Sequence, residues 1–128
     1  MPTIIDKKGN IEHTRGDVLP LDITFTNEDE TDYVFKKGDV VRFKVFKKKD
    51  CNCVEIQKDV VVETETTIVP IDLTKEDTKI GELINKPVEY WYEVELNPDT
   101  APQTPIGYTV SEGAKLFVLT PEGADKRD

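Results

Sequence analysis

The chain has 128 residues, of which 34% are charged, 37% hydrophobic and 8% aromatic, and its 26 acidic and 17 basic residues give a net charge of −9. This length fits one domain with a modest core and excludes a two-domain enzyme. The acidic balance excludes nonspecific nucleic-acid binding, because that activity needs clustered Lys and Arg against the phosphates.

The sequence also indicates a soluble protein made in the cytoplasm. The longest apolar stretches, such as Val60–Val62, span a few residues, whereas a membrane-spanning helix needs about 20. Residues 1–10 lack the apolar core of a secretion signal. Cys51 and Cys53 are too close for an easy mutual disulfide, and the chain has no other cysteine. We therefore expect a fold that stands without disulfides.

Apolar side chains recur with a period of two, which predicts an all-β domain, since no helical spacing is sustained over ten positions. The first strong strand lies between Asp17 and Thr26, with Pro20 expected near an edge or a strand start. A second strand is expected from Val40 to Lys47. Its buried face would hold Val41, Phe43 and Val45, while Phe46 is an exposed exception among charged residues.

Two β-branched runs follow, Val54–Val62 and Thr66–Leu73, and predict a hairpin or two neighbouring strands. Thr74 with Asp77 three residues later has the pattern of a helix cap. We therefore expect one short helical turn over Thr74–Lys79, bridging two sheets.

Val88–Asn97 is the clearest predicted strand and is expected to be central in its sheet. If Tyr90 and Tyr92 face the core, Trp91 lies on the opposite face with Glu89, Glu93 and Glu95. Three prolines predict a long hairpin loop over 97–105, after which the segments 106–110 and 114–120 close the domain. About seven short antiparallel strands match a two-sheet sandwich better than a barrel. The expected organisation is an arm at 1–13, the sandwich at 14–120 and a tail at 121–128.

Several short pieces of the sequence occur in a recognisable order between residues 13 and 120. They are Arg15, Gly16 and Asp17 before an alternating strand; Lys37, Gly38 and Asp39 before the next; the turn with Leu73, Thr74 and Asp77; the strand from Tyr90 to Leu96; and Gly113 before Leu116, Phe117 and Val118. In this order they resemble a family of small immunoglobulin-like domains of Gram-positive phages and prophages, which includes the N-terminal domain of baseplate upper proteins. The resemblance implies an immunoglobulin-like sandwich that packs beside other virion subunits and is not an enzyme.

No catalytic, cofactor-binding or metal-binding residue is assigned. The single histidine, His13, is expected to be an ordinary surface or edge residue, and with Cys51 and Cys53 it lacks the paired spacing of zinc motifs. The oxygen-rich segment 27–32 lacks the EF-hand pattern and is expected to be a solvated loop. At residues 15–17 the glycine is expected to let the chain turn while its charged neighbours stay in water.

An outward tryptophan suggests contact with a neighbouring subunit, because Trp is enriched in protein interfaces. The alternative is that Trp91 belongs to the sandwich core. The interface candidates are Trp91, Glu89 and Glu93, together with Ile4, Ile5 and Ile11 of the arm, which could become ordered by adding a strand to a neighbour.

These observations and the resemblance lead to one leading hypothesis. It is a non-enzymatic virion protein of a tailed phage or prophage, tail or baseplate associated, that acts through interfaces with other subunits or repeated copies of itself and binds neither nucleic acid nor membrane. One alternative is a capsid decoration or head-fibre protein. The other is a carbohydrate-binding module in which Trp91 with Tyr90 or Tyr108 forms a stacking platform.

Overall fold

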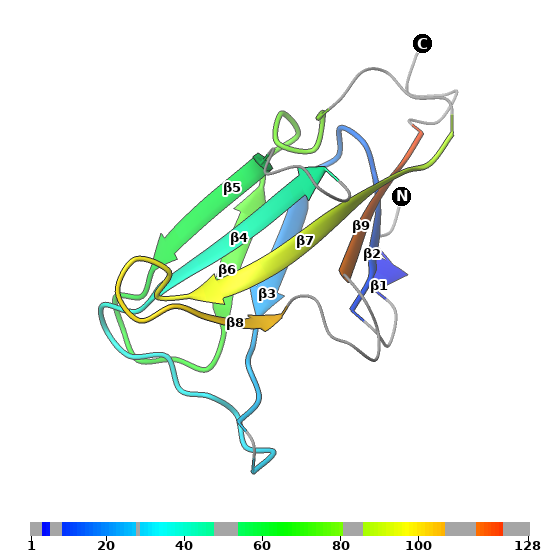
Figure 1. The fold of residues 1–128 in the computed structure, drawn as a ribbon. Helices are drawn as coiled ribbons and strands as arrows, with labels where there is room; N and C mark the ends of the chain where they lie inside the picture. The colour runs from blue at the N-terminus through cyan, green and yellow to red at the C-terminus, as the bar shows by residue number, and fades with distance from the viewer. Residues whose placement is uncertain are drawn as a thin grey trace.

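The computed structural model describes residues 4–5, 9–27, 29–47, 54–80, 86–106 and 115–121. Within these ranges the regular secondary structure consists of strands, and no helix long and apolar enough to cross a membrane is present there. The strands are β1 (Ile4–Ile5), β2 (Ile11–Thr14), β3 (Leu19–Ile23), β4 (Val40–Lys47), β5 (Val54–Val61), β6 (Val69–Leu73), β7 (Val88–Leu96), β8 (Gln103–Ile106) and β9 (Lys115–Thr120). They form two sheets (Figure 1), which confirms the predicted all-β sandwich.

The larger sheet has the order β1-β2-β9-β7-β4-β5, with β8 also paired to β7, and the smaller sheet consists of β3 and β6. In immunoglobulin sandwiches strands C, F and G share one sheet while B and E lie in the other. Here β4, β7 and β9 take the first three places and β3 and β6 the other two. The pairing is not wholly antiparallel as predicted, because β2 runs parallel to β9, with Ile11 opposite Phe117.

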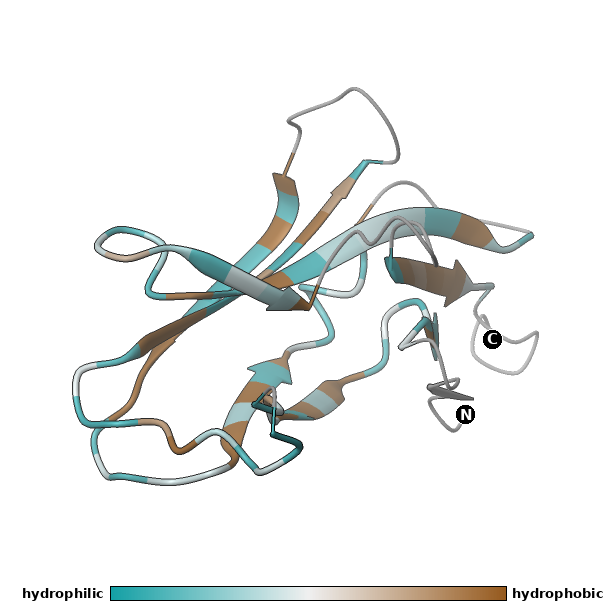
Figure 2. Ribbon diagram, turned by 60° about the horizontal axis from the view of Figure 1, so that its bottom comes forward, coloured by the Kyte–Doolittle hydropathy of each residue, from teal (hydrophilic) through white to brown (hydrophobic). Residues whose placement is uncertain are grey.

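Hydrophobic and hydrophilic residues alternate along the strands (Figure 2), so that each strand has one apolar and one polar face. In β3, for example, Leu19, Leu21 and Ile23 are buried while Pro20 and Asp22 are exposed. Pro20 lies in a two-stranded sheet, in which each strand has one unpaired edge. Proline has no N–H to donate to a neighbouring strand, so it is tolerated on such an edge. The predicted edge position of this proline is therefore confirmed.

The core between the sheets is built on an aromatic contact across β4, β7 and β9. The ring of Phe43 lies 5.6 Å from that of Tyr92 and 6.3 Å from that of Phe117. Phe43 and Phe117 are fully buried. Each buried side chain of this size contributes about 1.5 to 3 kcal/mol relative to an exposed one. These rings belong to one core cluster with Leu19, Ile71 and Leu73 of the smaller sheet, so their burial stabilises the sandwich.

Two predicted connections are wrong. The runs Val54–Val62 and Thr66–Leu73 do not pair with each other. β5 pairs with β4 in the larger sheet and β6 pairs with β3 in the smaller one, and the two strands meet only across the sheets. The loop expected over 97–105 is also shorter, since β8 begins at Gln103. Pro105 is accommodated in β8 because that strand, as far as it is described, pairs with β7 alone.

The predicted cap at Thr74 is present and opens a single turn, in which the Thr78 N–H donates to the Thr74 carbonyl at 3.2 Å, four residues back; no helix follows within residues 75–80. The Asp77 N–H donates to Thr74 Oγ1 at 3.2 Å, and the Thr74 N–H donates to Asp77 Oδ2 at 2.8 Å. The chain then turns at residues 75–78, where the side chain of Thr78 is fully buried. The turn does follow β6 and precede β7, so it lies on the crossing between the two sheets.

The boundary expected between arm and domain at residue 13 falls inside a strand. β2 covers Ile11–Thr14, and both Ile11 and His13 are only 2 to 3% exposed. The prediction that His13 is a surface or edge residue is therefore wrong. Buried and exposed side chains already alternate along β2, with Ile11 and His13 buried and Glu12 exposed, so the sandwich begins before residue 14. Of the expected tail at 121–128, only Pro121 lies within the described residues.

Candidate functional site

The outer face of the larger sheet, across β5, β4, β7 and β9, carries the residues that the sequence singled out. Tyr90 and Tyr92 are buried, while Trp91 between them is half-buried and points to the opposite side of β7. Of the two assignments that the sequence left open, the structure has the one in which the tyrosines face the core, and Trp91 does not belong to the core between the sheets.

Trp91 belongs to an apolar row that crosses four strands. Phe46 stands opposite Val54 on β5 and opposite Trp91 on β7, and Trp91 stands opposite Leu116 on β9. The rings of Phe46 and Trp91 meet edge to face at 6.4 Å and 78°. This contact explains why an aromatic residue occupies the polar side of β4: Phe46 is half-buried against the tryptophan instead of being an exposed exception.

Next to the apolar row lie two charged rows. Arg42 holds Asp59 with two bonds, Nε to Oδ1 at 2.9 Å and Nη2 to Oδ2 at 3.0 Å, and its Nη2 lies 3.3 Å from Asp99. The hydrogen bond to Asp59 raises the pKa of Arg42 above its ordinary value. The bidentate geometry fixes the guanidinium plane on the sheet.

In the second charged row, Lys44 Nζ lies 3.2 Å from Glu93 and 3.2 Å from Glu95. Partial burial lowers the pKa of Lys44, but the hydrogen bonds to the two carboxylates outweigh it, so that its pKa is raised. The two rows together place two basic side chains among four carboxylates. The outer face is therefore ordered and net acidic beside its apolar row.

The other interface candidates are dispersed. Glu89 is exposed and stands opposite Val118, two residues before Trp91 and on the same face of β7. The prediction that Ile11 is an interface residue is wrong, because its side chain is buried in the core. Ile4 and Ile5 form β1, which pairs with β2 of the same chain, Ile5 opposite Ile11. The described strands of the arm, β1 and β2, thus pair within their own domain.

The segment 15–17 has a structural role that sequence analysis missed. The Arg15 guanidinium is buried and donates to the carbonyls of Lys79 at 3.0 Å and Ile80 at 3.2 Å. The Gly16 N–H donates to Thr78 Oγ1 at 3.1 Å, and that hydroxyl donates to the Asp17 carbonyl at 2.8 Å. The expectation that Arg15 stays in water is wrong. Its partners lie more than 60 residues away, so no local pattern could have indicated them.

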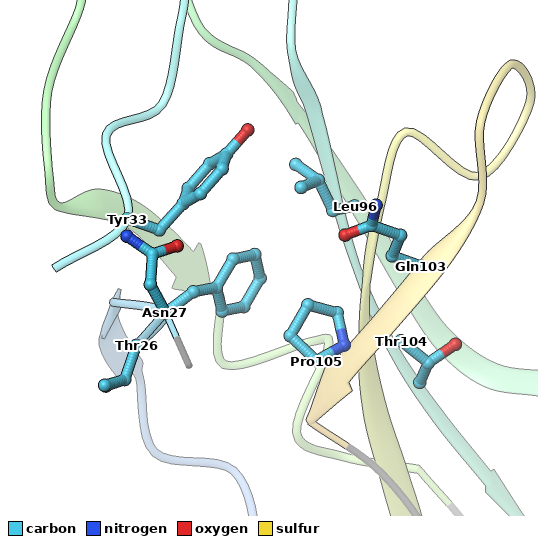
Figure 3. A pocket seen from close by; sticks show the side chains of 8 residues that line it. Thr26, Asn27, Tyr33, Leu96, Gln103, Thr104 and Pro105 are labelled. Carbon is cyan, nitrogen blue, oxygen red and sulfur yellow. The ribbon is translucent and has the colours of Figure 1, made fainter. Parts of the chain in front are cut away.

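A pocket of about 310 Å³ lies between the loop after β3 and the strands β7 and β8. Figure 3 shows Tyr33, Asn27 and Thr26 on one side and Leu96, Gln103 and Pro105 on the other. Phe25 and Leu96 are buried at its base, and Tyr33 donates its hydroxyl to Asp39 at 3.1 Å. The pocket therefore has apolar walls and an amide-lined rim.

The predicted stacking platform for a sugar does not form with Tyr90, because Tyr90 and Trp91 lie on opposite faces of β7. Tyr108, the other proposed member, lies outside the described residues, as do Cys51 and Cys53. In the part of the chain that the structure describes, no three His, Cys, Asp or Glu side chains gather as metal ligands would.

The oxygen-rich loop closes on itself. Asp29 accepts hydrogen bonds from the N–H and hydroxyl of Thr31, and these bonds lower the pKa of Asp29. Asn27 donates through Nδ2 to Thr31 Oγ1 at 3.1 Å. These bonds explain the loop geometry without a bound cation.

Comparison of the chain with models of protein families, with curated proteins and with solved structures finds no match.

Proposed function

We propose that the chain is a non-enzymatic structural subunit of a tailed-phage or prophage virion, associated with the tail or baseplate, which binds other virion subunits through the outer face of its larger sheet. The phage setting rests on the sequence resemblance. The mode of action rests on one observation: Trp91 lies outside the core, held by Phe46 in an apolar row that crosses four strands.

This arrangement suits protein contact. A tryptophan that already packs against its neighbour loses little side-chain freedom on binding, and Trp is among the residues that carry most interface energy. A row of apolar side chains on the open face of a sheet suits another protein surface better than a small substrate, which is held in a concave site.

The charge of the face suggests what the partner is. Four carboxylates around two basic side chains leave an acidic surplus beside the apolar row. A second copy would present the same surplus from a chain of net charge −9, and like charges oppose such a contact. The partner is therefore a different subunit with a basic and apolar surface, repeated as the particle symmetry requires.

The test is incorporation into particles. A phage whose own copy of this coding sequence is inactivated is complemented with the wild-type chain or with Trp91→Glu, and banded particles are assayed for the protein by quantitative mass spectrometry. Loss of an interface residue worth about 2 kcal/mol or more reduces incorporation roughly 30-fold at limiting protein. Val18→Glu is the matched control, because Val18 is 64% exposed and lies outside the outer face, before β3.

Each result has a defined meaning. Absence of the wild-type chain from particles contradicts the virion role, and equal incorporation of both variants contradicts the role of the outer face. Recovery with separated heads instead of tails favours capsid decoration. Binding to wall glycans that disappears in Trp91→Ala favours a carbohydrate-binding module. Thermal unfolding of each variant confirms that it is folded before incorporation is compared.

A further inference from the structure

β5 forms an open edge of the larger sheet. Along its whole length, Val54–Val61, it pairs with β4, and no other described strand lies beside it. Figure 1 shows β5 as the outermost strand on its side of the sheet. An edge strand presents a row of N–H and C=O groups with which another extended chain can pair.

The groups on this open side belong to Gln57, Asp59 and Val61. Directly after β5, the backbone of Val62 is directed toward the β4 side, because its N–H donates to the Asp39 carbonyl at 2.8 Å. Successive residues of an antiparallel strand direct their backbone groups to alternate sides. The N–H and C=O groups of Gln57, Asp59 and Val61 therefore point away from β4.

The other described edge strands are protected against such pairing. Pro20 in β3 stands opposite Asp72, and Pro70 in β6 stands opposite Asp22. Proline has no N–H to give the partner strand, so each proline nitrogen lies on the open side of its strand. β8 contains Pro105, and β1 is two residues long. Short edge strands and edge prolines prevent the addition of another strand, and β5 has neither feature.

A pocket of about 150 Å³ opens beside the end of this edge. It lies where the chain leaves β5 and enters β6, and its apolar walls include Val60, Val61, Val62, Ile68 and Pro70. Val61 is 58% exposed and Ile68 is 48% exposed, so the mouth of the pocket is apolar as well. A space of this size in a protein holds a group about as large as a benzene ring. The pocket therefore has room for one branched aliphatic side chain.

The charges around the pocket favour a basic ligand. Lys58 stands opposite the buried Phe43 and so lies on the inner face of β5, but its Nζ is held 2.9 Å from Asp77 and it does not line the pocket. Glu63 lines the rim, and Glu65 follows two residues later, both of them exposed. Complementary charge selects the binding partner, so these two carboxylates favour lysine or arginine.

From this arrangement we infer that the edge of β5 is a docking site for an extended, basic segment of another protein. The segment adds a strand to β5 and bonds the backbone of Gln57, Asp59 and Val61. Its residue beside Val60 points inward, as Val60 does, and places an aliphatic side chain in the pocket. In strand addition the main-chain bonds give affinity and the pocket selects the side chain. This inference does not depend on the proposed virion role.

Amide hydrogen exchange in the purified full chain tests it. The probe is a blocked heptapeptide in which lysine alternates with threonine around a central isoleucine. We expect saturable binding with a Kd of about 1 mM or lower. At about ten times that concentration of peptide, the amide protons of Gln57, Asp59 and Val61 should exchange roughly tenfold more slowly. The Asp22 amide, on the open side of β3, is the internal control and should be unaffected.

Two altered peptides separate the pocket from simple charge attraction. Glycine in place of the isoleucine leaves the pocket empty and should weaken binding at least about tenfold. Glutamate in place of every lysine should abolish binding. The inference is overturned if the isoleucine peptide does not bind, if the glycine peptide binds equally well, or if the slowed amides lie outside β5. Protection of the same amides that rises with protein concentration in the absence of peptide also overturns it, because the occupant is then a second copy.

Gln57→Pro and Gln57→Ala separate the backbone of the edge from its side chain. Gln57→Pro removes only an open-side N–H, as Pro20 does in β3, and should weaken binding about tenfold because a peptide carbonyl loses its donor. Gln57→Ala keeps the N–H and should bind as the wild type does. Equal affinity of the two variants contradicts the inference. If Gln57→Pro does not fold in thermal unfolding, the peptide series on the wild-type chain decides.

Trp91→Ala distinguishes this edge from the outer face. It should bind the peptide with unchanged affinity, because Trp91 is on β7, two strands away from β5. Loss of binding in Trp91→Ala would place the peptide on the outer face and overturn the inference. Failure of the chain to enter virus particles would leave the peptide result unchanged, so the two proposals fail separately.

Discussion

The buried hydroxyl of Thr78 joins two turns that are distant in sequence, and its removal should weaken the whole domain. Thr78 Oγ1 accepts from the Gly16 N–H at 3.1 Å and donates to the Asp17 carbonyl at 2.8 Å. Thr78→Val keeps the shape of the side chain but replaces the hydroxyl by a methyl group. The part-buried Gly16 N–H then faces a methyl group in place of its acceptor, whereas the Asp17 carbonyl still accepts from His13 Nε2 at 2.9 Å.

The magnitude follows from these two losses. A buried donor left without its acceptor costs about 1 to 3 kcal/mol, and the bond to the Asp17 carbonyl adds less because that oxygen keeps another partner. We expect Thr78→Val to lower the free energy of unfolding by about 2 kcal/mol. For a chain of this size that corresponds to a fall in Tm of roughly 8 °C.

Chemical denaturation and thermal unfolding followed by circular dichroism measure the effect. Thr78→Ser retains the hydroxyl and should recover most of the loss. Thr24→Val is the matched control, because Thr24 is exposed after β3 and should change the free energy of unfolding by no more than about 0.5 kcal/mol. Equal stability of Thr78→Val and Thr24→Val would refute the reasoning that the hydroxyl joins the two turns.

Three further changes have defined outcomes. Burial raises the pKa of Asp77, but the hydrogen bonds from the Thr74 N–H and from Lys58 outweigh it and leave the pKa lowered. The ionised Asp77 therefore stabilises the fold above its pKa in the unfolded chain, near 3.9, and this stabilisation is lost as the pH falls through its lower pKa in the folded protein. Asp77→Asn should flatten the decline of the free energy of unfolding below about pH 4 in acid titrations. Phe46→Ala removes the edge-to-face contact and should shift Trp91 fluorescence to longer wavelength while costing about 1 kcal/mol; unchanged emission would contradict that contact. Gly38 has φ +95°, and no atom lies within 4 Å of the position that a Cβ would take, so Gly38→Ala should lower stability by about 1 kcal/mol through backbone strain alone, as measured by urea denaturation.

The elements that were predicted well are those whose signal is local. Alternation in β3, β4 and β7 identified which side chains share a face, whereas it left open whether Trp91 or the two tyrosines beside it face the core. The pairing of Thr74 with Asp77 was also visible, because a cap needs only residues three positions apart. Local patterns could not show that Thr78 is buried, since its hydrogen bonds with Gly16 and Asp17 depend on a distant part of the chain.

The amino-acid sequence by itself determined that this protein is an acidic, all-β domain with alternating strands, because hydrophobic periodicity acts between near neighbours. Which face of its strand Trp91 occupies was decided by the structure, in which Tyr90 and Tyr92 are buried. Only the tertiary structure decided that β5 and β6 lie in different sheets, that Arg15 is buried, and that a pocket remains open beside β8. These features depend on which strands meet across long separations in the chain, and that choice is made by packing the whole core at once.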